Sequence, residues 1–205
     1  MPTKGESTRE NILAVAEQII LQKGFTATSI EEIINAANIT KSGFFYHFAG
    51  KNELAQGLVD RFLVEDSRIF NEMMDRARSL SEDPLQQMLI FMKLMAEMMA
   101  DIPNGHPGCL VASFTYESMQ FDAEVLEGVR QGMLDWREIF SKQLQAVADA
   151  YPMKTETPVD DLADMLTAVM EGGIVTSLTI GEPDILVRQL LLYRDYLRLL
   201  FGSVH

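Results

Sequence analysis

The chain has 205 residues, a formal net charge of −13, one cysteine and 47% hydrophobic residues. One cysteine excludes an intrachain disulfide, and this much apolar material argues against a largely disordered chain. We find neither a charged-then-apolar leader nor a run of ~20 apolar residues that would span a bilayer, so we expect a cytoplasmic protein without membrane association, built from one or two globular domains.

The acidic charge is distributed unevenly along the chain. Residues 1–51 contain five lysine or arginine residues and five glutamates, so this segment is net neutral and the remaining 154 residues carry the whole −13. An acidic protein usually lacks the basic footprint of a nucleic-acid binder. The neutral N-terminal segment nevertheless leaves that function open, and the asymmetry points to two tasks in one chain.

Apolar residues repeat with helical period along nearly the whole sequence. The first helix is expected to begin near Ser7 or Thr8 and to end at Gly24, and a capping box from Thr28 to Glu31 opens a short second helix. Thr40 is the expected N-cap of a third helix. The remaining expected helices begin at Lys51 and at Pro84 and span about 109–120, 123–150, 159–180 and 184–201. No segment alternates with period two, so we expect an all-α fold of about nine helices.

The third of these segments carries the most informative pattern. Three short helices in the first 50 residues, the last two joined by a tight turn, have helix-turn-helix spacing. At 100° per residue, Phe44, Phe45 and Phe48 lie on one side of the third helix, which we expect to pack into the core. The other side is polar, and residues 40–51 contain no aspartate or glutamate.

Such a face can approach phosphates without repulsion. We expect Lys41 and Ser42 to reach base edges, and Gly43 to allow close approach of the backbone. The hydroxyl, imidazole and ammonium groups of the other candidates suit phosphate oxygens, as do the helix starts; these candidates are Thr28, Thr40, Tyr46, His47 and Lys51. A solvated helical hairpin without DNA activity explains the same pattern, so the residues alone leave both interpretations open.

The segment from Thr40 to Phe48, followed by Gly50 to Leu54, resembles the recognition-helix signature of TetR-type transcriptional regulators. The similarity extends over about residues 8–60. It implies a helix-turn-helix DNA-binding domain (residues 1–50), a helical ligand-binding and dimerisation domain (residues 51–205), and repression relieved by a small molecule. Phe45 departs from the family pattern, in which a tyrosine that touches phosphate is common; we therefore assign Phe45 to packing and keep Tyr46 and His47 as phosphate contacts.

The acidic C-terminal part is rich in methionine and aromatic residues. Methionine adapts to irregular apolar shapes and suits a ligand pocket, although it also fills cores. With the family resemblance, we expect a pocket for a small, largely apolar or aromatic inducer, lined by residues from several helices: Phe62, Met88, Phe91, Met92, Met95, Cys109, Met133, Trp136, Phe140 and Met170. Plain core packing is the alternative for each of them.

Cys109 follows His106 and is expected to open a helix. A thiol at a helix start beside a cationic histidine can have a lowered pKa and react with electrophiles or oxidants. Two roles for Cys109 are therefore open. It is the sensing residue of a redox- or electrophile-responsive regulator, or it is a small buried hydrophobic residue.

The last two predicted helices carry continuous apolar stripes. They are expected to pair with a second copy as a four-helix bundle, in line with the dimers of the family, through Leu162, Leu166, Val169, Leu190, Tyr193 and Leu197. Packing within one chain is the alternative.

The sequence lacks the patterns that would support an enzyme. HExxH, GxSxG, P-loop and CxxC motifs are absent, as are the Glu-x-x-His pairs of carboxylate-bridged metal bundles. We expect no catalytic activity, no metal and no cofactor, and the partners to be double-stranded operator DNA, an inducer and a second copy of the chain. A ligand-binding helical protein without DNA activity is the competing hypothesis.

Overall fold

The computed structural model describes residues 4–202, and these contain nine α-helices and no strand. The predicted all-α class and helix number are confirmed. The chain divides into two compact units. The first unit comprises the residues up to Val64 together with Gly108–Gly132, and the second comprises Glu65–Pro107 and the residues from Met133 onward. This division does not fall at the predicted boundary between residues 50 and 51, because α4 (Lys51–Leu80) is one continuous helix that contributes to both units.

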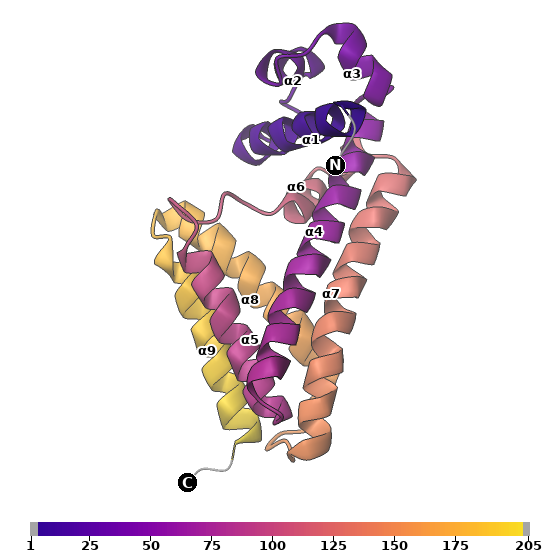
Figure 1. Ribbon diagram of the computed structural model, residues 1–205. Helices are drawn as coiled ribbons and strands as arrows, with labels where there is room; N and C mark the ends of the chain where they lie inside the picture. The colour runs from indigo at the N-terminus through magenta and orange to yellow at the C-terminus, as the bar shows by residue number, and fades with distance from the viewer. Residues whose placement is uncertain (1–3, 203–205) are drawn as a thin grey trace. The chain divides into compact units, whose positions relative to one another are not determined.

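The first unit contains α1 (Lys4–Lys23), α2 (Ile30–Ala36), α3 (Lys41–His47), the start of α4, α6 (Leu110–Tyr116), a short 3-10 helix η1 (Ser118–Gln120) and the start of α7 (Ala123–Ala150). Figure 1 shows α1, α2 and α3 as a group of three helices. Their apolar stripes meet in a core with less than 2% exposure at Ile12, Leu13, Ile20, Ile33, Phe44, Phe48, Leu54 and Leu58. Burial of these stripes is the main source of stability for such short helices.

The start of α2 differs by one residue from the prediction. Ser29, not Thr28, is the N-cap, and its hydroxyl accepts a hydrogen bond from the Glu32 amide at 3.2 Å. The Glu32 carboxylate accepts a hydrogen bond from the Ser29 amide in return. The capping box therefore exists, but in the neighbouring register, which both Thr28-Ser29 and Glu31-Glu32 allow.

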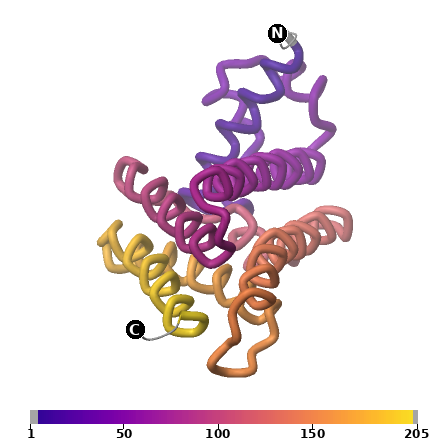
Figure 2. Tube along the Cα trace, turned by 60° about the horizontal axis from the view of Figure 1, so that its bottom comes forward, coloured from indigo at the N-terminus to yellow at the C-terminus, as the bar shows by residue number. Residues whose placement is uncertain are grey.

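The second unit contains the remainder of α4 and α7, α5 (Pro84–Ala100), α8 (Val159–Ile180) and α9 (Asp184–Phe201). Helices α5 and α8 both run along α9 (Figures 1 and 2). Gly173 allows α8 and α9 to approach closely, since a Cβ at this position would lie 3.2 Å from the Leu186 Cα. The buried Tyr193 hydroxyl donates to the Leu162 carbonyl at 2.7 Å and links the same pair.

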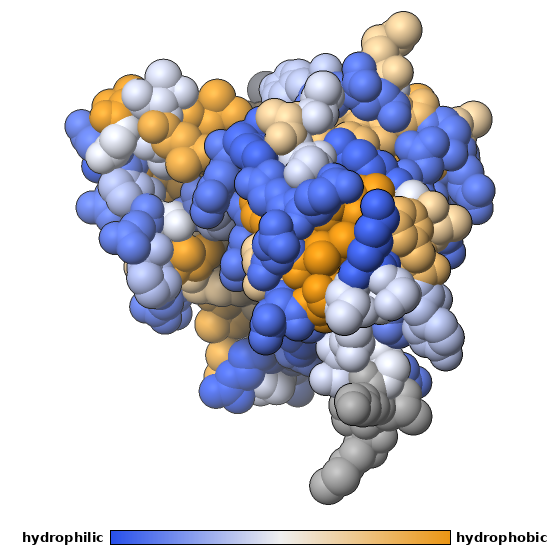
Figure 3. Space-filling model, turned by 90° about the horizontal axis from the view of Figure 1, so that it is seen from above, coloured by the Kyte–Doolittle hydropathy of each residue, from blue (hydrophilic) through white to orange (hydrophobic). Residues whose placement is uncertain are grey.

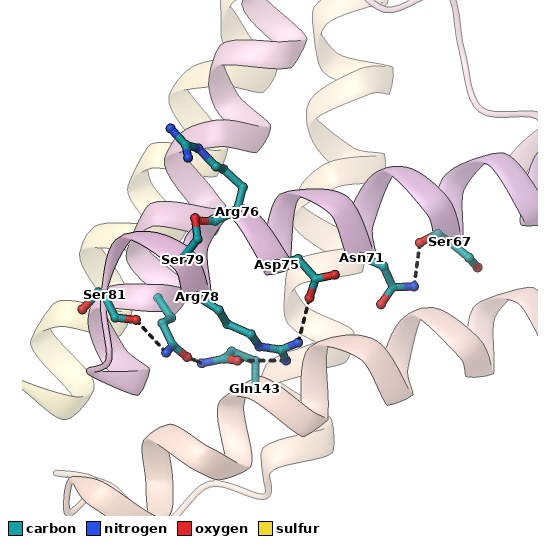
Figure 4. A network of polar contacts seen from close by, with 9 residues as sticks. Ser67, Asn71, Asp75, Arg76, Arg78, Ser79, Ser81 and Gln143 are labelled. Carbon is teal, nitrogen blue, oxygen red and sulfur yellow. Dashed lines mark hydrogen bonds and ion pairs between the residues drawn. The ribbon is translucent and has the colours of Figure 1, made fainter.

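A buried glutamine joins three segments at the corner between α4 and α5 (Figure 4). The Gln143 amide of α7 donates to the Pro84 carbonyl and to the Gln87 side chain, both at 3.0 Å. Gln87 in turn donates to the Ser81 carbonyl at 2.9 Å. Because buried polar groups are costly when unpaired, this network fixes the turn that leads into α5.

Helix α8 is, within residues 4–202, the one helix that is long and apolar enough to cross a membrane by length and composition. Its best 18-residue window has a mean hydropathy of 1.2, and 39% of that window is buried. A single such helix is weak evidence for a membrane span, since core helices of water-soluble proteins pass the same test.

We expect Asp83→Ala to lower the free energy of unfolding by about 1–2 kcal/mol, the usual range for loss of an N-cap. Asp83 caps α5 by accepting from the Gln86 amide at 2.7 Å, and its second oxygen accepts from the Tyr151 hydroxyl. Urea denaturation followed by circular dichroism measures the effect. Asp83→Asn is the control, because asparagine caps as well as aspartate; equal losses in the two variants would contradict the capping role.

Candidate functional site

Helices α2 and α3 form a helix-turn-helix with a four-residue turn, residues 37–40. Asn38 takes the left-handed conformation, with a φ of 53°, which asparagine tolerates better than most residues. The Ile39 amide donates to the Ile34 carbonyl at 3.1 Å, and the Asn11 side chain of α1 donates to the Ala37 carbonyl at 3.0 Å. Hydrogen bonds to α2 and from α1 therefore fix the conformation of this turn.

The exposed surface of α3 is formed by Lys41, Ser42, Phe45 and Tyr46. Phe44 and Phe48 are buried, as predicted, whereas Phe45 is 45% exposed. The assignment of Phe45 to packing is therefore wrong. At 100° per residue, residue 45 lies between residues 41 and 42 on the helix wheel, about 60° from residue 48 and about 100° from residue 44, so it lies beside the buried side of the helix and not within it.

The start of α3 is capped as the sequence indicates. The Thr40 hydroxyl oxygen accepts from the Gly43 amide at 3.0 Å and lies 3.1 Å from the Ser42 hydroxyl oxygen. A Cβ at Gly43 would lie 3.2 Å from the Thr40 hydroxyl oxygen, so glycine here gives room to the cap. Gly43 and His47 are half-buried at the edge of the exposed surface.

Two predicted phosphate contacts are directed into the protein. Thr28 is buried, and its hydroxyl donates to the Gly24 carbonyl at 2.8 Å, so the prediction that Thr28 contacts DNA is wrong. The Lys51 ammonium donates to the Phe25 carbonyl at 2.7 Å and lies 4.2 Å from the centre of the Phe25 ring. Burial lowers the pKa of Lys51. These contacts give Lys51 a structural role at the turn between α1 and α2.

Glu117 is a residue of this unit that the sequence analysis missed. Its carboxylate accepts hydrogen bonds from the Phe25 amide at 2.7 Å, from the Thr26 amide at 2.8 Å and from the Thr26 hydroxyl. Burial alone would raise the pKa of Glu117, but these hydrogen bonds and the nearby Lys51 ammonium outweigh it and lower the pKa. Glu117 lies 91 residues from Thr26 in the sequence, and no local pattern signals the contact.

Aromatic packing joins the same segments. The Phe25 ring centre lies 5.5 Å from that of Phe114 on α6 and 4.5 Å from that of Phe121, and the latter two rings are stacked at 4.4 Å. Residues 108–121 are thus built into the unit that carries the helix-turn-helix. The turn that precedes α2 is held by a carboxylate, an ammonium and two aromatic rings.

Two family models match the chain, one described as "Bacterial regulatory proteins, tetR family" over residues 12–58 and one as "Tetracyclin repressor-like, C-terminal domain" over residues 84–190. The chain belongs to the TetR family. It is a DNA-binding transcriptional regulator, and the family resemblance found in the sequence is confirmed.

Relatives of this TetR-family protein match over most of their length. The uncharacterized HTH-type transcriptional regulator YxaF of Bacillus subtilis is 28% identical over 87% of this chain and 88% of its own. The HTH-type transcriptional repressor BepR of Brucella suis is 25% identical over 88% and 85%. A TetR-family regulator from Agrobacterium tumefaciens has a similar fold, with a TM-score of 0.79, 20% identity and coverage of 97% and 100%.

The residues predicted to line an inducer pocket belong to both units. Phe62 and Cys109 lie in the first unit, and the other eight lie in the second. Met88, Phe91, Met92 and Met95 of α5 are buried in the second unit, as are Trp136, Phe140 and Met170. Met133 is partly exposed and lines a small cavity of about 270 Å³ between α7 and α8, together with Leu134, Arg137, Asp164, Thr167, Ala168 and Glu171.

An aromatic cluster surrounds the single tryptophan of this TetR-family chain. The Phe70 ring centre lies 6.1 Å from that of Trp136, 5.3 Å from that of Phe140 and 6.4 Å from that of Phe91. Met88, Met92 and Met95 are buried on the same helix as Phe91, and we call these three residues together with the four rings the aromatic–methionine cluster.

Cys109 is the N-cap of α6, as its position in the sequence predicts. Its sulfur accepts a hydrogen bond from the Ala112 amide at 3.5 Å, and the side chain is buried. Burial lowers the pKa of His106, which disfavours the cationic imidazole that the sensing hypothesis requires. A small buried hydrophobic residue is the interpretation that these observations favour.

The predicted dimer residues pack inside the second unit. Leu162, Leu166, Leu190, Tyr193 and Leu197 are buried there and Val169 is half-buried, so the first five are not available to a partner chain. The exposed apolar residues of α8 and α9 lie at neighbouring positions of the same helices: Met165, Val175, Leu178, Ile180, Leu192 and Leu199. The apolar stripes predicted from the sequence thus lie on the side of each helix that joins α8 to α9 within one chain.

We expect Glu117→Ala to expose the turn between α1 and α2 by removing the acceptor for two backbone amides. Hydrogen bonds to a charged acceptor are worth about 1.5–3 kcal/mol each, so exchange of the Phe25 and Thr26 amides should accelerate by about tenfold or more. Hydrogen–deuterium exchange at pH 7 measures this. Glu124→Ala on the exposed start of α7 is the control. Equal exchange of the Phe25 and Thr26 amides in both variants would show that Glu117 does not hold this turn.

The contribution of Glu117 to the free energy of unfolding should persist in mild acid. Because the folded pKa of Glu117 lies below the ordinary 4.5, its stabilisation is complete above that pH and is lost as pH falls through the lowered value. The difference in unfolding free energy between the wild type and Glu117→Gln should therefore be constant from pH 7 to 5 and shrink only below the ordinary value. A difference that already disappears near pH 6 would contradict this assignment.

Proposed function

We propose that this protein is a dimeric repressor that leaves its operator when a small, largely apolar or aromatic inducer binds. The exposed surface of α3 carries the proposal: it presents Lys41, Ser42 and Tyr46 with no carboxylate between Thr40 and Lys51, in a chain of net charge −13. A surface of this kind suits the major groove, where lysine and serine can bond base edges and tyrosine can bond phosphate. Its site of action is then the cytoplasm, where the DNA is, and no catalytic role is assigned.

We expect a second copy of the chain to cover the exposed apolar residues of α8 and α9. A helix-turn-helix that reads two half-sites needs two copies related by a twofold axis. Members of the family are typically dimers, which supports this assignment. Gly172, whose Cβ position is open, lies among these exposed residues of α8 and would let a partner helix approach closely.

The aromatic–methionine cluster is the proposed inducer site. Methionine side chains change rotamer at little cost, so the cluster can open space for an apolar guest without exposing polar groups. Reciprocal coupling follows if the inducer favours a conformer that binds the operator poorly, because each ligand then weakens the other by the same factor.

Operator binding is tested by selecting genomic DNA fragments on the full-length protein and measuring their affinity at several salt concentrations. We expect a small set of fragments bound at nanomolar to tens of nanomolar Kd, in the range of specific regulators. Retention of no fragment at low salt would overturn the proposed function.

The dimer is tested with Leu192→Glu combined with Leu199→Glu, which places two carboxylates among the exposed apolar residues of α9. We expect sedimentation at twice the chain mass for the wild type, at the chain mass of 23.1 kDa for the variant, and loss of operator binding by the variant. Leu80→Glu is the control, because Leu80 is also more than half exposed and lies on α4, outside these helices. A wild type that sediments at 23.1 kDa would disprove the dimer.

The inducer site is tested through the fluorescence of Trp136, the single tryptophan of the chain. We expect apolar aromatic compounds that raise the melting temperature to quench or shift this emission, and Met92→Ala to alter their affinity. Compounds that stabilise the protein and release it from the operator while leaving the Trp136 emission unchanged would place the inducer elsewhere.

A further inference from the structure

Phe45 is the residue of α3 whose exposure differs most from the prediction, which assigned it to core packing. Phe44 and Phe48 on the same helix are at most 1% exposed, but Phe45 remains 45% exposed. Its ring lies at a steep angle to the Phe44 ring, with the centres 5.4 Å apart, and nearly half of the side chain is left exposed to solvent. Figure 3 shows that hydrophobic residues reach the protein surface in patches between hydrophilic ones.

The position of Phe45 places it within the surface that reads DNA. On the helix wheel, residues 41, 45, 42 and 46 follow one another, and all four are exposed. Phe45 thus lies between Lys41 and Ser42, the two residues suited to base edges. A docked duplex that meets these two side chains also covers the phenyl ring.

The chemistry of the ring limits what it can contact there. Phenylalanine has no hydroxyl and cannot donate a hydrogen bond to a phosphate or to a base. Covering a half-exposed ring against an apolar group is favourable, and the C5-methyl of thymine is the apolar group that base pairs present in the major groove.

We propose that Phe45 is a specificity-determining residue that contacts the methyl group of a thymine in each half-site. This inference rests on the proposed docking of α3 in the major groove. It adds to that function a readout of thymine by apolar contact, next to hydrogen bonding by Lys41 and Ser42.

The test uses a duplex selected from random DNA by the full-length protein, in which each thymine is replaced in turn by deoxyuridine. The replacement removes only the methyl group. For the wild type we expect one thymine in each half-site at which the replacement lowers affinity about fourfold, the size for one buried methyl group. For Phe45→Ala we expect no loss at that position, and for Phe45→Leu a partial loss.

Two control measurements separate this contact from others. Met119→Ala removes an apolar side chain that is 93% exposed on η1, and we expect it to retain the wild-type response to deoxyuridine. Circular dichroism should show native helix content in all variants, since Phe45 is not a core residue.

Three results would overturn the proposal. If the wild type binds the duplex but responds to no deoxyuridine, or if Phe45→Ala responds as the wild type does, Phe45 does not read thymine. If Phe45→Ala weakens every duplex equally, the ring contacts the sugar–phosphate backbone instead. If the wild type selects no duplex at all, the DNA-binding function fails together with the inference, a fourth outcome that is distinct from these three.

Discussion

The burial of Phe44 and Phe48 determines which side of α3 meets solvent. Both side chains are inaccessible, and Phe48 lies beneath the Arg9 guanidinium, whose carbon is 5.2 Å from the ring centre. Gly57 of α4 makes room for the same ring, since a Cβ there would lie 3.1 Å from a Phe48 ring carbon. With two large rings fixed in this way, rotation of α3 about its axis would expose them, at a cost of about 1.5–3 kcal/mol for each side chain. This packing therefore decides that Lys41, Ser42, Phe45 and Tyr46 form the exposed, acid-free surface of α3.

The turn between α1 and α2 is the second fixed point of the unit. Three donors on Phe25 and Thr26 converge on the Glu117 carboxylate, and the Lys51 ammonium caps the Phe25 carbonyl. Glu117 follows α6, so the position of the helix-turn-helix depends on a segment that the sequence places far downstream. The contacts of Glu117 thus give α6 a direct physical link to the turn that precedes α2.

Local signals in the sequence are sufficient to predict the helices and the family. Capping residues, Gly24 and Asp83-Pro84 marked helix ends, because the backbone groups there require those side chains or conformations. Long-range contacts were not predictable in the same way. Thr28 and Lys51 have the chemistry of phosphate contacts, and only the fold shows that their polar atoms bond to Gly24 and Phe25. The stripes on α8 and α9 likewise identify apolar surfaces without saying which of them faces the neighbouring helix and which faces a partner.

The acid-free surface of α3 is tested most directly by adding one negative charge to it. Tyr46→Glu alters a residue that is 82% exposed on α3, and Tyr116→Glu makes the same change at a residue that is 80% exposed on α6. Both variants should fold, because neither side chain is part of a core. We expect Tyr46→Glu to weaken operator binding at least tenfold in 100 mM salt and Tyr116→Glu to leave it within twofold of the wild type. Equal affinities for the two variants would show that α3 is not the surface that meets the DNA.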